Sequence, residues 1–152
     1  MPTAPTPHEN PWPRRIRTAG LWTTGAFFIV SGMNHFRVPG AYVGMIPPSL
    51  PWPAGLNLVA GVFEILGGIG VLLRPLRLLS GWGLVALLIA VFPANLHVAL
   101  LGHMPGFSFS PLTLWLRLPF QAVLIAWVAW VSICDDPADR RGAPPGPPAS
   151  RR

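Results

Sequence analysis

The chain has 152 residues, of which 51% are hydrophobic and 11% are charged. All 11 basic residues are arginines that stand mostly between long apolar runs, which argues against a nucleic-acid-binding protein and is typical of a membrane protein. The single cysteine, Cys134, excludes an internal disulfide and a CxxC redox pair.

Four apolar segments follow one another along the chain, and each is long enough to cross a bilayer as a helix. We therefore predict an all-α fold, a bundle of four transmembrane helices that forms one domain over residues 18–134. The predicted spans are residues 19–36, 54–73, 78–101 with a kink at Pro93, and 112–134. The tails, residues 1–17 and 135–152, are rich in proline and are predicted to be disordered.

The first span has an alternative interpretation. Arg14 and Arg15 precede it, so the segment resembles a twin-arginine signal peptide. The apolar run is long and lacks a small-residue cleavage site, which favours an uncleaved span.

Residues 37–53 connect the first two spans and hold five prolines, yet they remain apolar. Proline-rich chain cannot form a regular helix or a central strand. We expect this segment to form a cap at the membrane surface or between the helices.

The distribution of arginines predicts the orientation. Nine of them fall on one side of a four-span path, and only Arg37 and Arg117 fall towards the other. By the positive-inside rule, both termini of this multi-pass membrane protein are expected in the cytoplasm.

One carboxylate, Glu64, lies about halfway along the second span. At about 1.5 Å per residue it is about 15 Å from the outer end, where a charge costs several kcal/mol unless it is protonated or paired. Arg117, a few residues into the fourth span, is the expected partner. The two residues are either a structural pair that fixes helix register or part of a functional site.

Polar and small residues recur at helical spacing on one face of each span, and these faces are expected to point inward. The four faces are Thr24, Phe28, Ser31 and His35; Asn57, Gly61, Glu64 and Gly68; Ala86, Ala90, Ala94 and His97; and Thr113, Arg117, Gln121 and Ser132. Most of the polar members lie in the outer half, so they predict a pocket that is open, or capped, on the extracytoplasmic side. Asn95 is expected to point away from His97 and from this pocket.

The two membrane histidines allow three interpretations. His35 and His97 are either interfacial groups bonded to backbone carbonyls or groups that relay protons and bind a ligand. Axial ligation of haem between two helices is the weaker alternative, because no other feature supports it. The sequence has no HxxxH or ExxH spacing, so no metal site is predicted.

Five short motifs together resemble the DoxX family of small four-helix bacterial membrane proteins. They are Asn34-His35-Phe36-Arg37 with Pro39 and Tyr42, Met45-Ile46-Pro47-Pro48, Glu64-Ile65 with Gly67-Gly68, Val91-Phe92-Pro93-Ala94-Asn95 with His97, and Arg117-Leu118-Pro119-Phe120-Gln121. The resemblance covers residues 20–132. It implies a redox or quinone-linked setting, since the wider relatives include a small subunit linked to thiosulfate:quinone oxidoreduction.

These observations predict a redox- or quinone-linked membrane subunit that binds a small ligand. Glu64 is the candidate catalytic proton donor or acceptor. The candidate ligand-binding residues are His35, Arg37, Asn57, His97, Arg117 and Gln121. The alternative is a non-catalytic anchor or assembly scaffold for a partner oxidoreductase, with residues 37–53 as the docking surface. A transporter would need an inward path, which the apolar inner half does not offer.

Overall fold

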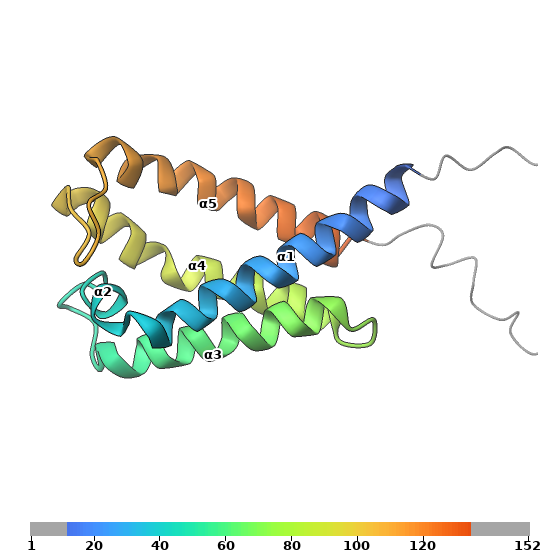
Figure 1. The fold of residues 1–152 in the computed structure, drawn as a ribbon, viewed down its shortest axis with the longest axis horizontal. Coiled ribbons are helices and arrows are strands. Elements are labelled where there is room, and N and C mark those ends of the chain that lie inside the picture. The colour runs from blue at the N-terminus through green and yellow to red at the C-terminus, as the bar shows by residue number, and fades with distance from the viewer. Residues whose placement is uncertain (1–11, 135–152) are drawn as a thin grey trace, which may run out of the picture.

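The computed structural model describes residues 12–134, which form a bundle of α-helices (Figure 1). The predicted all-α class is therefore confirmed, and within the described residues the only β-type pairing is an isolated bridge between Met104 and Phe107. The five helices are α1 (Trp12–Arg37), α2 (Pro39–Val43), α3 (Pro53–Leu72), α4 (Arg77–Leu101) and α5 (Pro111–Ser132).

The helices form two pairs. α1 packs along α3, α4 packs along α5, and α3 also contacts α4, whereas α1 and α5 touch only over a short stretch. We call the end where α1 begins and α5 ends the inner end, and the end covered by α2 the outer end. Figure 1 shows α1 and α5 close together towards the inner end and apart towards α2.

Glycines allow the close contact between α1 and α3. A Cβ added at Gly32 would lie 2.7 Å from the carbonyl oxygen of Gly61, and one added at Gly25 would lie 2.9 Å from that of Gly68. Contacts this short with a backbone atom are not tolerated, so only glycine permits this approach. Gly61 and Gly68 are buried, as predicted for the second span.

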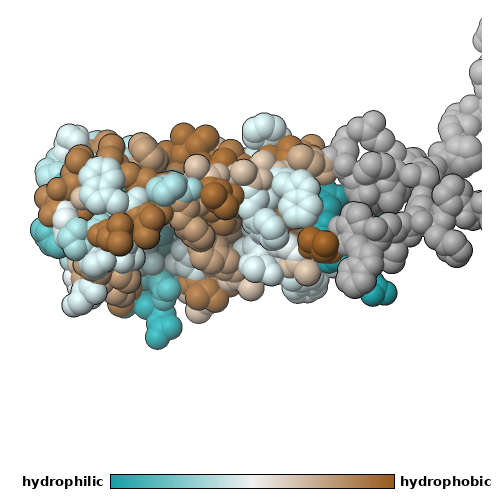
Figure 2. Space-filling model, turned by 90° about the horizontal axis from the view of Figure 1, so that it is seen from above, coloured by the Kyte–Doolittle hydropathy of each residue, from teal (hydrophilic) through white to brown (hydrophobic). Residues whose placement is uncertain are grey.

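Three helices, α3, α4 and α5, are long and apolar enough to cross a membrane. α1 is not among them, because its threonines and the Asn34-His35 pair make it more polar. Large hydrophobic side chains are exposed along all four long helices. Figure 2 shows them covering much of the middle of one face. An exposed apolar surface of this extent is typical of a protein in contact with lipid.

The helix ends differ in detail from the predicted spans. α1 begins at Trp12, so residues 12–17 are helical although they were expected to belong to a disordered tail. The cap also contains a short helix, α2, which begins with Pro39. Proline suits a helix start because its missing N–H would have no partner in the first turn. The remaining parts of the two predicted tails lie outside the described residues.

The predicted inward faces are correct for the first two spans and only partly correct for the third, where Ala94 lines the cavity but Ala86 and Ala90 face outward. Thr24, Phe28 and His35 are buried, as are Asn57 and Glu64, whereas Ala86 and Ala90 are exposed. α4 instead buries a larger apolar face made of Gly81, Leu84, Val85, Leu88, Val98 and Ala99. In the fourth span Gln121 and Ser132 are buried and Thr113 is exposed.

Candidate functional site

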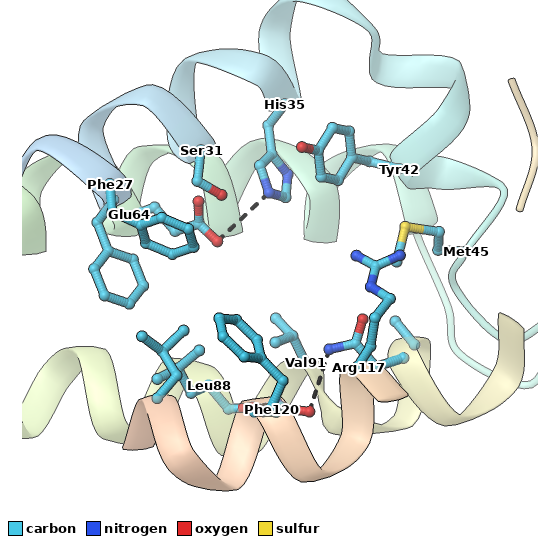
Figure 3. A pocket seen from close by; sticks show the side chains of 15 residues that line it. Phe27, Ser31, His35, Tyr42, Met45, Glu64, Leu88, Val91, Arg117 and Phe120 are labelled. Atoms are coloured by element: carbon cyan, nitrogen blue, oxygen red, sulfur yellow. Dashed lines mark hydrogen bonds and ion pairs between the residues drawn. The ribbon is translucent and has the colours of Figure 1, made fainter. Parts of the chain in front are cut away.

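A cavity of about 210 Å³ lies between the α1–α3 pair and the α4–α5 pair, near α2 (Figure 3). An apolar cluster that includes Val71, Leu84 and Val128 fills the bundle on its inner side, and a second that includes Met45 and Met104 closes the outer end. All five helices contribute polar groups to the lining, which are Ser31, His35, Tyr42, Glu64, Asn95, Arg117 and Gln121.

Asn57 holds the imidazole of His35 in one orientation. The Asn57 amide nitrogen donates to the backbone carbonyl of His35 at 3.1 Å, so the amide oxygen is left to accept from Nδ1 of His35 at 2.8 Å. Nδ1 therefore carries a hydrogen, and Nε2 points towards Glu64. Asn57 does not line the cavity itself. It acts on the site through His35.

His35 and Glu64 form a pair that holds one proton. Nε2 of His35 lies 3.6 Å from Oε1 of Glu64. Because Nδ1 is already protonated, the contact is attractive only if one more proton is shared, either as imidazolium facing carboxylate or as imidazole facing carboxylic acid. Both side chains are buried, with residue exposures of 7% and 8%. This arrangement can donate or accept a single proton at the cavity wall.

The second oxygen of Glu64 is unsatisfied by the protein. Oε2 is buried and has no hydrogen-bond partner among the described residues. A buried carboxylate oxygen without a donor is costly, by about 1–3 kcal/mol or more for a charged group. Glu64 lines the cavity. A ligand group that donates a hydrogen bond there would remove this cost.

Tyr42, from α2, covers the His35 ring. The two rings stack with centroids 3.9 Å apart and planes 28° apart. Burial, and after it the negative charge of Glu64, raise the pKa of the Tyr42 phenol, while the positive charge of Arg117 lowers it. The Tyr42 phenol therefore lies within electrostatic reach of both charged residues of the cavity.

Arg117 does not pair with Glu64, so the predicted ion pair is wrong. Its Nη1 lies 3.0 Å from the sulfur of Met104, and within the described residues no carboxylate lies within ion-pairing distance of it. Figure 3 shows Arg117 extending from α5 towards α2 on the side of the cavity opposite Glu64. A thioether is a weak acceptor. The guanidinium is thus a half-buried cation that can bind an oxygen of a ligand.

Gln121 connects the two helices of the α4–α5 pair. Its amide nitrogen donates to the Leu88 carbonyl, and its amide oxygen accepts from Asn95 at 3.2 Å. Asn95 lines the cavity, contrary to expectation. His97 points elsewhere, as their angular separation predicts. The sequence analysis assigned His97 to the cavity instead of Asn95, because it defined the inward face of α4 by the alanines of that helix.

Besides Asn57, two predicted ligand-binding residues do not line the cavity. Arg37 is exposed at the end of α1, and Nδ1 of His97 lies 3.0 Å from the Met45 carbonyl, where it attaches the cap to α4. The structure therefore brings together His35, Glu64, Arg117 and Gln121.

Neither haem nor metal ligation is favoured by the geometry. Both ring nitrogens of His35 face protein groups and His97 does not line the cavity, so the two histidines do not form an axial pair. Within residues 12–134 no three potential metal ligands cluster together.

The analysis of inward faces did not assign Tyr42 or Met104 to the site. Both come from the proline- and glycine-rich connections, where helical periodicity gives no information. Tyr42 appears only within the motifs of the DoxX resemblance, and that was the available signal for it.

Comparison with known families places the chain in one without an assigned function. It belongs to the family described as a domain of unknown function, DUF8561, whose model matches residues 24–132. No curated protein and no solved structure matches the chain. The matched range covers α3, α4 and α5 in full, the part of α1 from residue 24 onwards, and every residue that lines the cavity.

Proposed function

We propose that this DUF8561 protein is a four-span subunit of the bacterial inner membrane that binds a quinone in the cavity and works with a partner oxidoreductase. The observation that carries the proposal is the unsatisfied Glu64 oxygen on one wall and the guanidinium of Arg117 on the other, which among the described residues meets only the weak acceptor Met104. The resemblance to the DoxX family agrees with it.

Counting α1 as the fourth span has physical support. α1 has 26 residues, about 39 Å at the usual rise, which exceeds the hydrocarbon thickness of about 30 Å. It packs along α3, which is itself apolar enough to span. Arg15, Arg17, Arg74 and Arg77 lie towards the inner end, and Arg37 and Arg117 lie in the outer half. This bias favours cytoplasmic termini.

The quinone–quinol couple has the chemistry that both walls require. One ring oxygen accepts a hydrogen bond from Arg117. At the other end of the ring, the hydroxyl of the quinol donates to Oε2 of Glu64, and the carbonyl of the quinone accepts from Oε2 when Glu64 is protonated. Reduction to the quinol takes two electrons from the partner oxidoreductase and two protons. The His35–Glu64 pair supplies one of these protons and water supplies the other, and both are returned when the quinol is oxidised. The cavity, at about 210 Å³, is below the usual size for a drug-like ligand and suits a single substituted ring.

The experiment measures binding of decylubiquinone to the full chain in nanodiscs by quenching of tryptophan fluorescence. Glu64→Gln and Arg117→Gln should each weaken binding at least tenfold, because each removes one charged partner of the ring. Arg37→Gln is the matched control, since Arg37 is exposed and does not line the cavity. Equal affinity in all four proteins would refute the proposal.

A second candidate is a non-catalytic scaffold, favoured by the cap. Trp52 is 71% exposed and has a left-handed backbone with φ of 54° directly before Pro53. A non-glycine residue in this conformation is strained. If the cap docks an oxidoreductase, Trp52→Ala should abolish co-purification of quinone-reducing activity while Glu64→Gln leaves it intact. The reverse pattern supports the quinone site.

A further inference from the structure

The line along which α1 and α5 face each other, which we call the α1–α5 seam, is closed only at the inner end. There Arg17 donates to the carbonyls of Val131 at 3.0 Å and Cys134 at 2.8 Å, and Trp127 donates to the Thr24 hydroxyl at 3.0 Å. Beyond Thr24, no hydrogen bond joins α1 to α5 among the described residues. The cavity begins one turn further out, at Phe27 and Phe28.

Two phenylalanines mark where the cavity reaches the surface. Of the residues that line it, only Phe27 and Phe120 are largely exposed, with exposures of 45% and 60%. Phe27 belongs to α1 and Phe120 to α5, so the opening lies in the α1–α5 seam. Both residues are near the middle of helices longer than 20 residues. The opening therefore lies at the depth of lipid tails.

The outer end offers no comparable route. Met45, Val98, Ala99, Met104 and Leu114 are all nearly completely buried and form one apolar cluster there. His97 contacts the Met45 carbonyl and so attaches this cluster to α4. A ligand that arrives from water at the outer end would have to displace the cluster.

The lining changes in polarity along the path inward from the seam. The exposed lining residues are the apolar Phe27 and Phe120, whereas His35 and Glu64 are buried and Arg117 is half-buried; Figure 3 shows all five around the cavity. This order matches an amphiphile whose polar ring is inside and whose apolar part points outward. Lipid-facing aromatic side chains can cover such a tail without any polar cost.

We infer that the ligand is a quinone with an apolar tail, which enters sideways from the lipid and leaves its tail between Phe27 and Phe120. This inference rests on the proposed quinone function and adds the route and the class of quinone. It predicts that a tail-less quinone, arriving from water, is a poor ligand.

The first test locates the tail. A decylubiquinone analogue with a diazirine on its tail is bound to the full chain in nanodiscs, irradiated, and mapped by peptide mass spectrometry. Labels should fall on residues 23–31 of α1 and 116–124 of α5. Labels on the cap, residues 38–50, or evenly around the bundle would overturn the lateral route.

The second test narrows the entrance. Phe120→Trp should slow association of decylubiquinone at least tenfold in stopped-flow quenching, because a larger ring fills the seam. Phe63→Trp is the matched control: Phe63 is 56% exposed on α3 and does not line the cavity. Equal rates in the two variants would overturn the inference.

The two proposals fail in different ways. If no quinone binds, or if Glu64→Gln has no effect, the quinone function itself is refuted. If binding depends on Glu64 but the labels appear on the cap, the quinone function stands and the lateral entrance is refuted.

Discussion

The same four long helices build the inner and the outer half of the bundle, but they pack tightly in the inner half and surround a cavity in the outer half. In the inner half, fully buried apolar residues such as Val71, Val128 and Val131 fill the interior, and Arg17 ties α1 to the end of α5. In the outer half, the helices separate around a cavity with buried polar groups. The inner half therefore stabilises the fold, and the outer half carries groups that are costly to bury without a ligand.

The largest expected effects come from replacing glycines at the contact between α1 and α3, and these replacements should affect the two halves of the bundle differently. Gly25→Ala in the inner half and Gly32→Ala beside the cavity each push a Cβ into a backbone carbonyl of α3, so each should destabilise the fold by about 1–3 kcal/mol. Gly32→Ala should also weaken quinone binding, because Glu64 Cβ lies 3.0 Å from the added group.

Thermal unfolding in detergent and quinone binding in nanodiscs measure these two effects. Gly83→Ala is the control, since a Cβ there meets nothing within 4 Å and alanine favours a helix. A Gly25→Ala protein that loses binding while keeping its stability would contradict the division between the halves.

The inner closure depends on Arg17. Arg17→Gln removes hydrogen bonds from a charged group to the carbonyl of Val131 in α5 and to that of Cys134 just beyond it, each worth about 1.5–3 kcal/mol. We expect a lower melting temperature and unchanged affinity for decylubiquinone. Because α1 and α5 would then be held mainly by Trp127 and Thr24, hydrogen exchange should increase at the inner ends of both helices. Unaltered exchange there would show that Arg17 does not hold the seam.

The sequence predicted the all-α class, the long helices and half of the site, for identifiable reasons. Apolar runs and helical spacing sufficed for the helices and for the inward faces that hold Glu64 and His35. They could not give the rotation of α4, because all its faces are apolar. They also paired Glu64 with Arg117 by depth alone, although pairing depends on which helices are adjacent. α3 packs along α1, so Glu64 meets His35 instead.

A smaller effect is expected from removing a buried oxygen that has no hydrogen-bond partner. Each half of the bundle contains one such oxygen. Within the described residues these are Oε2 of Glu64 and the hydroxyl of Ser132. Ser132→Ala should stabilise the fold by up to about 1 kcal/mol, since it removes an unsatisfied polar group, and should leave quinone binding unchanged. Glu64→Gln should reduce binding. Denaturation and binding curves for both variants test whether Oε2 of Glu64 contributes to ligand binding while the Ser132 hydroxyl does not.

The smallest expected effect is on Tyr42, the single tyrosine of the chain. Burial and the charge of Glu64 raise the pKa of its phenol, and Arg117 lowers it. Glu64→Gln should therefore move the pKa of Tyr42 down towards its ordinary value, because a nearby negative charge no longer opposes ionisation. Arg117→Gln should move it further up. Alkaline titration of tyrosinate absorbance measures both shifts, and Arg37→Gln, outside the cavity, should cause neither. If both cavity variants shifted the pKa in the same direction, the Tyr42 phenol would not lie between the two charges, and the cavity would lack the polarity on which ligand binding depends.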